Sequence, residues 1–367
     1  MAAVALLATL VMVGVLSRYV MSRALLAMLL VGTVLVSIHT LIDLIREARS
    51  LTGGYGLSEM LVYLARTMPR RLYDLFPFIA LIGSLTGLGA LAAGNELVAM
   101  RAAGFDRRHL AARVLAAILL CLVLLGILSE WVIPELEKTA RAERQQARTG
   151  QLHLGSFGSL WLRDGQRIVR IGRSAWADDD ALEFGDLTFY ELGAGMRPRL
   201  VMVAERGRHV DGRWALFNAS GRYLDPVTTV EQAGRVGLDS VLNPDVFAAA
   251  VSRPRMLSLR DLIAMQEFLR SNGLRAEPYA QAMWERLLYP VNTLAIVLVG
   301  LLFLFSRPRQ AGGGINLFAG VALGLVFFVL TRLTQGISAL LPIPLWLSSL
   351  FPALAIFLLA IWLLRRP

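Results

Sequence analysis

Two groups of basic residues in this sequence could bind an anionic ligand. One group follows an apolar run at residues 24–45, and the other follows an apolar run at residues 110–133. The two groups comprise Arg46, Arg49, Arg66, Arg70 and Arg71, then Lys138, Arg141, Arg144 and Arg148. A guanidinium group donates two parallel hydrogen bonds, a geometry that suits phosphate. The arginines therefore predict contact with a phosphorylated ligand, such as the head group of a lipid.

The same basic residues have acidic neighbours, which allow a second interpretation. The nearby carboxylates are those of Asp43, Glu47, Glu135, Glu137 and Glu143. Ion pairs with these carboxylates would account for the arginines without any ligand, while the aliphatic stems lie along apolar surface. Both interpretations stay open at the level of the sequence.

A short polar segment between two apolar runs could bind a partner protein. Residues 94–110 read GNELVAMRAAGFDRRHL, and the part from Glu96 to Met100 has a helical pattern with Leu97 and Met100 on one side. A short helix that carries Glu96 and Arg101 suits a docking partner. A solvated connector between two spans is the alternative.

Several motifs that carry enzymatic chemistry are absent from the sequence. Lys138 is the only lysine and is not part of a GxxxxGK[ST] loop, which excludes ATP hydrolysis by that route. The sequence also lacks HExxH, GxSxG and a GxGxxG that opens a helix after a strand. Cys121, the only cysteine, excludes an intrachain disulfide and a cysteine-based metal site. We predict that the chain is not an enzyme and holds no cofactor of its own.

A membrane-anchored or lipid-modifying enzyme that acts in the periplasm is the alternative function. It would require a set of acid, base or nucleophilic groups outside the membrane. The dense carboxylate cluster at Asp178–Asp180 reads as a solvated loop, and His153 and His209 are isolated in the sequence.

Long apolar segments indicate a membrane protein. The chain is 56% hydrophobic, and a helix of about 20 apolar residues crosses the hydrocarbon core of a bilayer. Six windows meet this condition, at about 24–45, 73–94, 110–133, 281–305, 315–337 and 346–364. Residues 1–16 are also apolar but have no initial positive charge and no clear A-x-A site, so we expect an upstream extension or interfacial segment there.

Arginines beside the windows predict the orientation of the chain. They lie before the first window, between the second and third, between the fourth and fifth, and after the sixth. These arginines are Arg18 and Arg23, then Arg101, Arg107 and Arg108, then Arg307 and Arg309, then Arg365 and Arg366. The positive-inside rule places all four groups in the cytoplasm. Both termini are then inside, and the residues between the third and fourth windows are outside.

The insert between the third and fourth windows has the pattern of an all-β domain. Short alternating runs such as Gln166–Arg173 are separated by Gly, Asp and Asn turns, which favours six to nine strands in a β-sandwich or a jelly-roll-like fold. We predict a transmembrane half at 1–134, a periplasmic β domain at 135–257 and a second transmembrane half at 258–367. Ser258 is a predicted N-cap of an amphipathic helix at the start of the last segment.

Five stretches together resemble the lipopolysaccharide export permeases of the LptF/LptG type. The pattern ELVxMxAxGF lies within Asn95–Phe105, and the others are Ser17–Tyr19, Glu130–Pro134, Ser159–Ile168 and Tyr279–Pro290. The resemblance covers the chain after residue 15 and is closer to the LptG branch than to LptF.

The resemblance implies a permease subunit of an ATP-binding cassette (ABC) transporter in the bacterial inner membrane. Its substrate would be lipopolysaccharide, taken from the outer leaflet and passed to a periplasmic bridge. Its partners would be an LptF-like sister permease, a cytoplasmic LptB-like ATPase dimer that binds the ATP, and a single-span LptC-like protein. In the family, an acidic residue on the loop helix couples to the ATPase, and it corresponds to Glu96, with Met100 and Arg101 on the same helix.

The resemblance also implies which residues contact the lipid A phosphates and sugars. Family residues near the outer end of the first span correspond to Asp43 and Arg46, and basic residues after the third span correspond to Arg141 and Arg144. Thr40 stands where the family often has a lysine, so the contacts to phosphate differ from the family pattern at this place.

Overall fold

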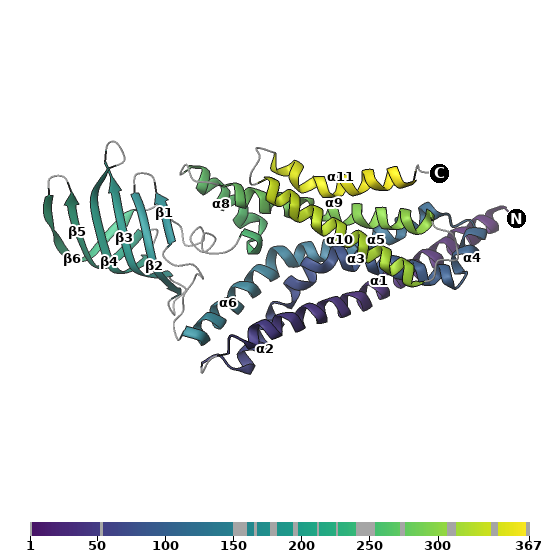
Figure 1. Ribbon diagram of the computed structural model, residues 1–367, viewed down its shortest axis with the longest axis horizontal. Helices are drawn as coiled ribbons and strands as arrows, with labels where there is room; N and C mark the ends of the chain where they lie inside the picture. Colours follow the sequence, from purple (N-terminus) through teal and green to yellow (C-terminus); the bar gives the residue numbers. More distant parts are fainter. Residues whose placement is uncertain are drawn as a thin grey trace. The chain divides into compact units, whose positions relative to one another are not determined.

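The chain forms two compact units, which Figure 1 shows in the computed structural model. Unit 1 comprises Met1–Ile45, Thr67–Val132 and Trp284–Pro367, and unit 2 comprises Arg46–Arg66 and Ile133–Met283. The structure describes residues 2–51, 54–149, 160–164, 167–176, 182–193, 197–210, 213–224, 227–239, 254–271, 276–306, 313–338 and 344–364.

Unit 1 is built from long apolar helices. The first helices are α1 Ala2–Ala48, α3 Met68–Ala93, α4 Glu96–Ala102, α5 Arg107–Ile127 and a π-helix Leu128–Val132. They are followed by α9 Glu277–Ser306, α10 Gly313–Ser338 and α11 Leu345–Leu364. The end of α1 from Arg46 and the start of α9 up to Met283 belong to unit 2. Each predicted window overlaps one of the long helices, and the third continues from α5 into the π-helix. The expected upstream extension is helical and continuous with the first window.

Several of these helices are long enough to cross a membrane. Among the described residues the stretches Gly14–Ala48, Met68–Ala93, Arg107–Arg148 and Glu277–Phe305 meet the length and composition of a span. The apolar stretches Gly320–Thr334 and Leu345–Leu358 are shorter. A helical protein with several membrane-length helices is therefore confirmed, and the count of six spans stays a prediction.

Glycines let two helices pack closely against α3. A Cβ atom at Gly83 would lie 2.6 Å from the Cγ and 2.7 Å from the Cα of Met28 on α1. A Cβ at Gly320 on α10 would lie 2.8 Å from a methyl group of Leu85 on α3. Small residues allow such close approach between helices in a bilayer. The glycines thus serve packing within the chain.

Two side chains of α9 bind backbone carbonyls of other helices. Pro77 has no N–H, so the carbonyl of Tyr73 one turn earlier lacks its usual helical partner. The hydroxyl of Tyr289 donates to this carbonyl at 2.5 Å, and the two tyrosine rings stack at 4.3 Å. Arg286 donates to the carbonyl of Ser129 in the π-helix. These bonds satisfy polar backbone groups among apolar helices, where water cannot do so.

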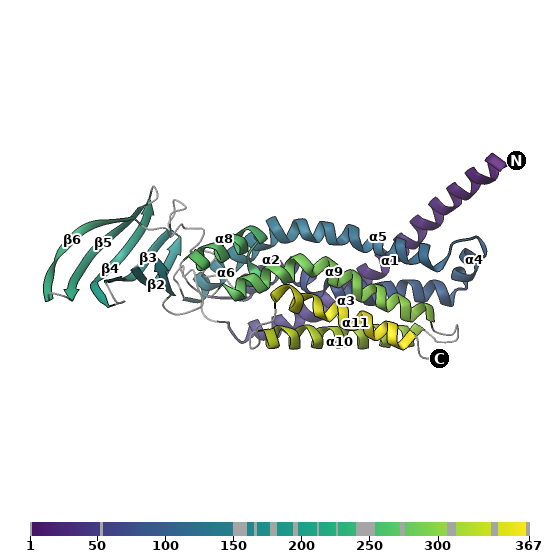
Figure 2. The same cartoon turned by 90° about the horizontal axis from the view of Figure 1, so that it is seen from above.

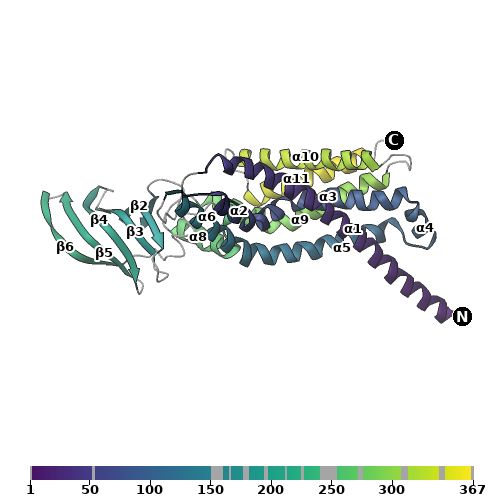
Figure 3. The same cartoon turned by 90° about the horizontal axis from the view of Figure 1, so that it is seen from below.

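The short helix α4 lies at one end of unit 1. In Figures 2 and 3 it is found at the same end as the C-terminal end of α11. The polar segment between α3 and α5 and the last described turn of the chain are therefore on the same side of the helical unit.

Unit 2 contains an antiparallel sheet and several helices. The helices are α2 Leu57–Arg66, α6 Ile133–Thr149, a 3-10 turn Pro254–Met256 and α8 Leu259–Ser271. The strands are β1 Leu160–Asp164, β2 Arg167–Trp176, β3 Leu182–Leu192, β4 Pro198–Val210, β5 Arg213–Leu224 and β6 Val227–Asp239. The predicted β insert is confirmed as an antiparallel sheet.

The jelly-roll topology predicted for the insert is not confirmed. The described strands follow one another across one six-stranded sheet in the order β1 to β6. Only short connections separate the strands, and short connections pair consecutive strands directly as hairpins. A jelly roll instead needs Greek-key crossovers between two sheets.

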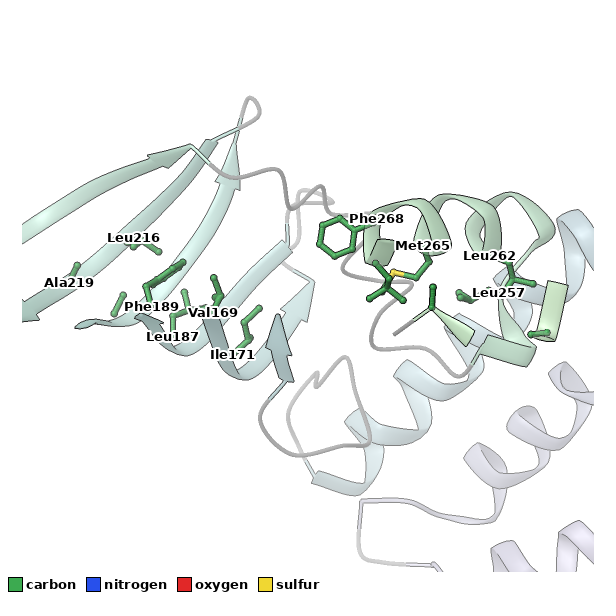
Figure 4. Packing of buried hydrophobic residues seen from close by; sticks show 14 residues of the cluster. Val169, Ile171, Leu187, Phe189, Leu216, Ala219, Leu257, Leu262, Met265 and Phe268 are labelled. Atoms are coloured by element: carbon green, nitrogen blue, oxygen red, sulfur yellow. The ribbon is translucent and has the colours of Figure 1, made fainter. Parts of the chain in front are cut away.

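One face of the sheet is apolar and buried. Ile171, Leu187, Ala204 and Ala219 are register partners on four neighbouring strands, and all four are buried (Figure 4). Side chains two apart in a strand point to the same face, so Val169 belongs to this face with Ile171. The alternation of polar and apolar residues along the strands accounts for this apolar face.

Helix α8 has the predicted N-terminal cap. The Ser258 hydroxyl accepts from the Asp261 N–H at 3.1 Å, and the Asp261 carboxylate accepts from the Ser258 N–H at 3.2 Å. Each side chain thereby satisfies an N–H group that the helix leaves unpaired. The structure groups α8 with the sheet in unit 2, whereas the division at residues 134 and 257 stays a prediction.

Candidate functional site

An ion pair between Glu47 and Arg144 lies at the centre of a polar cluster in unit 2. The Arg144 guanidinium donates through both Nε and Nη2 to the Glu47 carboxylate, and the Nη2 to Oε2 distance is 3.0 Å. Glu47 is buried and Arg144 is half-buried. The Tyr63 ring lies 5.2 Å from the Arg144 Cζ atom. This two-pronged geometry is the one by which arginine binds carboxylate or phosphate.

Tyr55 closes the cluster on one side. Its side chain is fully buried. Burial, the larger cause, and the negative charge of Glu47, the second, raise the pKa of the Tyr55 hydroxyl to about 12. The phenol therefore stays neutral at physiological pH. The backbone at Gly54 lies close to the backbone of α6, since a Cβ at Gly54 would lie 2.5 Å from the carbonyl oxygen of Ala147. We call Glu47, Tyr55, Tyr63 and Arg144 the outer arginine cluster.

Other basic residues near this cluster also have carboxylate partners. Arg141 pairs with buried Glu137 one turn earlier on α6 at 2.9 Å. Arg66 of α2 pairs with Glu143 of α6 at 2.5 Å. Neighbouring acidic residues therefore pair with several of the basic residues, as the second interpretation expected, and contact of these arginines with a ligand stays a prediction.

Asp43 takes part in a separate network within unit 1. Its carboxylate accepts from Nε of Arg71 at 2.8 Å, and His39 lies 3.2 Å from it. Arg71 is buried and also donates to the Thr67 hydroxyl at 2.9 Å. Arg46, three residues after Asp43, is exposed. The structure thus brings Arg144 to Glu47 and Asp43 to Arg71.

Sequence reasoning did not single out Tyr55, Tyr63 or Arg71 as parts of these networks. Tyr63 lies on α2 and Tyr55 just before it, and neither side chain belongs to a sequence motif that indicates a ligand. The Arg144 partner is 97 residues away in the chain. Local patterns therefore identified the charged residues but not which carboxylate each arginine binds.

The predicted coupling residues lie on α4. Glu96 is half-exposed, and its Oε2 atom accepts a hydrogen bond from the hydroxyl of Tyr19 on α1 at 2.7 Å. Leu97 and Met100 are buried, as their helical spacing predicted, and Arg101 is half-buried. In this structure Met100 anchors α4 against unit 1, and Glu96 has the more accessible side chain.

The comparisons with known proteins cover nearly the whole chain. The model of the family described as "Lipopolysaccharide export system permease LptF/LptG" matches residues 18–366. The chain is 28% identical over 358 residues to the lipopolysaccharide export system permease protein LptG of Escherichia coli strain K12, covering 96% of this chain and 98% of that protein. It is 28% identical over 360 residues to LptG of Haemophilus influenzae, covering 97% and 99%.

These relatives are permease subunits, which are transport components and not enzymes. The match includes both the apolar helices and the segment that forms the sheet. It confirms the resemblance carried by the five sequence stretches, including its closeness to LptG. This chain belongs to the LptF/LptG family of lipopolysaccharide export system permeases.

Proposed function

We propose that this chain is one of two permease subunits of an ATP-driven transporter. The transporter takes lipopolysaccharide from the outer leaflet of the bacterial inner membrane and passes it to a periplasmic bridge. The observation that carries this proposal is the family match over residues 18–366. A permease without a phosphate-binding loop needs an energy source in another chain, here an LptB-like ATPase dimer that binds the ATP.

The proposed arrangement has six spans with both chain ends in the cytoplasm and the sheet in the periplasm. The arginines beside the apolar windows support it through the positive-inside rule. The position of α4 at the same end of unit 1 as the end of α11 supports it independently (Figure 2). An LptF-like sister permease and a single-span LptC-like protein complete the assembly.

We propose that Arg141 and Arg144, with Asp43 and Arg46, contact the phosphates and sugars of lipid A. In the structure the Arg144 guanidinium is already held by Glu47. A phosphate that binds Arg144 through the same two nitrogens replaces the Glu47 carboxylate, which carries less negative charge than phosphate. Leaving Glu47 buried without a partner is unfavourable. Release of Glu47 toward water thus accompanies binding.

Coupling to the ATPase is assigned to α4. Glu96 offers a carboxylate to a basic surface of the ATPase, while Met100 anchors the helix and Arg101 flanks it. An attraction of this kind is sensitive to salt when it is exposed. Glu96→Arg is therefore expected to abolish ATPase association or coupled transport.

The substrate assignment is tested by the double variant Arg141→Glu with Arg144→Glu. The complex is purified with its ATPase and sister permease, and the retained lipopolysaccharide is measured by mass spectrometry. We expect a loss of about tenfold or more, because two attractive charges become repulsive. Arg148→Glu, an exposed change one turn further along α6, is the matched control.

Unchanged lipopolysaccharide in the folded double variant would rule out this site. Folding is checked by copurification of the partners and by thermal unfolding, since the Arg144→Glu change places a second carboxylate against Glu47. Arg144→Gln keeps a polar side chain and separates loss of binding from loss of fold. A stable wild-type chain that copurifies with neither an ATPase nor a second permease from its native host would contradict the proposed function itself.

A further inference from the structure

A hydrogen-bond chain joins α4 to α1. The hydroxyl of Tyr19 donates to Glu96 Oε2 at 2.7 Å, and it accepts from Arg23 Nη2 at 3.0 Å. The Arg23 guanidinium carbon also lies 5.0 Å from the centre of the Tyr19 ring. Arg23 thereby restrains the phenol through both a hydrogen bond and a cation–π contact.

The phenol determines which group donates in each of these hydrogen bonds. A tyrosine hydroxyl has one hydrogen to donate, and here Glu96 receives it. The bond engages one carboxylate oxygen, Oε2, and among the described residues Glu96 makes no other hydrogen bond or ion pair. The second oxygen, Oε1, therefore stays available to a basic group of another protein.

Both ends of this hydrogen-bond chain are fixed to packed helices. On the α4 side, Leu97, Met100 and Phe105 are buried, so Glu96 moves together with its helix. On the α1 side, Ala24 and Met28 are buried, and this part of α1 lies in close contact with α3 at Gly83. A force on the Glu96 carboxylate is thus transmitted to α1 through Tyr19.

We propose that Tyr19 is a positioning residue for energy coupling. It orients the Glu96 carboxylate for the ATPase and carries the displacement of α4 into α1, the helix whose far end bears Asp43, Arg46 and Glu47. This inference rests on the coupling role proposed for Glu96. It adds a residue of α1 to a mechanism that otherwise involves α4 alone.

The test uses the whole transporter reconstituted in liposomes with the ATPase and the periplasmic acceptor. Lipopolysaccharide delivered and ATP hydrolysed are both measured for Tyr19→Phe, Glu96→Ala and the double variant. Tyr19→Phe removes only the hydroxyl and is expected to lower lipopolysaccharide delivered per ATP at least about threefold, given the strength of hydrogen bonds to charged groups. The double variant should be no worse than Glu96→Ala, because the hydroxyl then has no acceptor.

Ser22→Ala is the matched control on the same helix. The Ser22 hydroxyl donates to the backbone carbonyl of Tyr19 and makes no contact with Glu96. The control should keep the wild-type ratio of delivery to hydrolysis. Copurification of the ATPase with Tyr19→Phe should also stay within about twofold of wild type, because this variant keeps the charge of Glu96 that is proposed to attract the ATPase.

Three results would overturn the inference. One is a wild-type ratio in Tyr19→Phe, and another is a double variant whose defect is the product of the two single defects. Loss of assembly in Tyr19→Phe alone would indicate a structural role. Normal coupling in Glu96→Ala would instead refute the proposed coupling function, and the role of Tyr19 with it, so the two failures are distinguishable.

Discussion

Glu47 is the residue that occupies Arg144, because both of its carboxylate oxygens accept hydrogen bonds from the Arg144 guanidinium. The pairing of Arg144 with Glu47 joins positions 97 residues apart. A hydrogen-bonded pair at this separation depends on how α1, α2 and α6 meet, which periodicity does not encode.

Glu47→Gln tests whether the Glu47 carboxylate competes with the ligand for Arg144. The amide keeps the shape of the side chain but removes the full charge that holds the guanidinium. We expect the retained lipopolysaccharide to rise at least about twofold, because Arg144 becomes available to phosphate. The free energy of unfolding should fall by about 2 kcal/mol, since a half-buried charge-assisted bond is weakened. Mass spectrometry and thermal unfolding measure the two effects.

Glu135→Gln is the control for this change, because Glu135 is exposed on the same helix as Arg144. It should change neither the retained lipid nor the stability. A Glu47→Gln protein that is less stable but retains no additional lipid would show that the pair is structural only.

At the level of the elements, the long helices could be predicted from the length of the apolar windows, and the strands from the alternation of polar and apolar residues. The capped start of α8 and the buried pair Leu97 and Met100 on α4 were also predictable, because each depends on residues within one or two turns. The meander of the sheet was not, since alternation identifies strands but not their order in space. The sequence likewise does not show which helices α3 contacts. Glycines at these contacts allow α1 and α10 to pack closely against α3.

Gly83→Ala tests the close contact between α1 and α3. Its added Cβ would meet the backbone of Met28 at 2.7 Å, so the two helices must separate. The expected loss of stability is about 1–3 kcal/mol, as for other overpacked interiors. Gly126→Ala on α5 is the control, because no atom lies within 4 Å of its added Cβ. Thermal unfolding of both variants in detergent measures the loss. Equal stability of the two variants would show that the contact at Gly83 tolerates an added methyl group.

For the molecule as a whole, the arginine groups beside the apolar windows predict which ends face the cytoplasm, independently of the family. The family match identifies a membrane permease, and the structure shows long apolar helices and a separate antiparallel sheet. In the proposed orientation, the proposed substrate site and coupling helix lie on opposite sides of the bilayer, so a signal between them must pass along a span such as α1.

Site-directed labelling tests this orientation directly. In a Cys121→Ser background, Ser220→Cys on β5 and Ala103→Cys after α4 each place one thiol at an exposed position. A membrane-impermeant thiol reagent should label Ser220→Cys in cells whose outer membrane is permeabilised, and should label Ala103→Cys only after the inner membrane is opened. The reverse pattern would put the sheet in the cytoplasm. The outer arginine cluster would then have no access to lipid in the outer leaflet, and transport toward a periplasmic acceptor would require a different site.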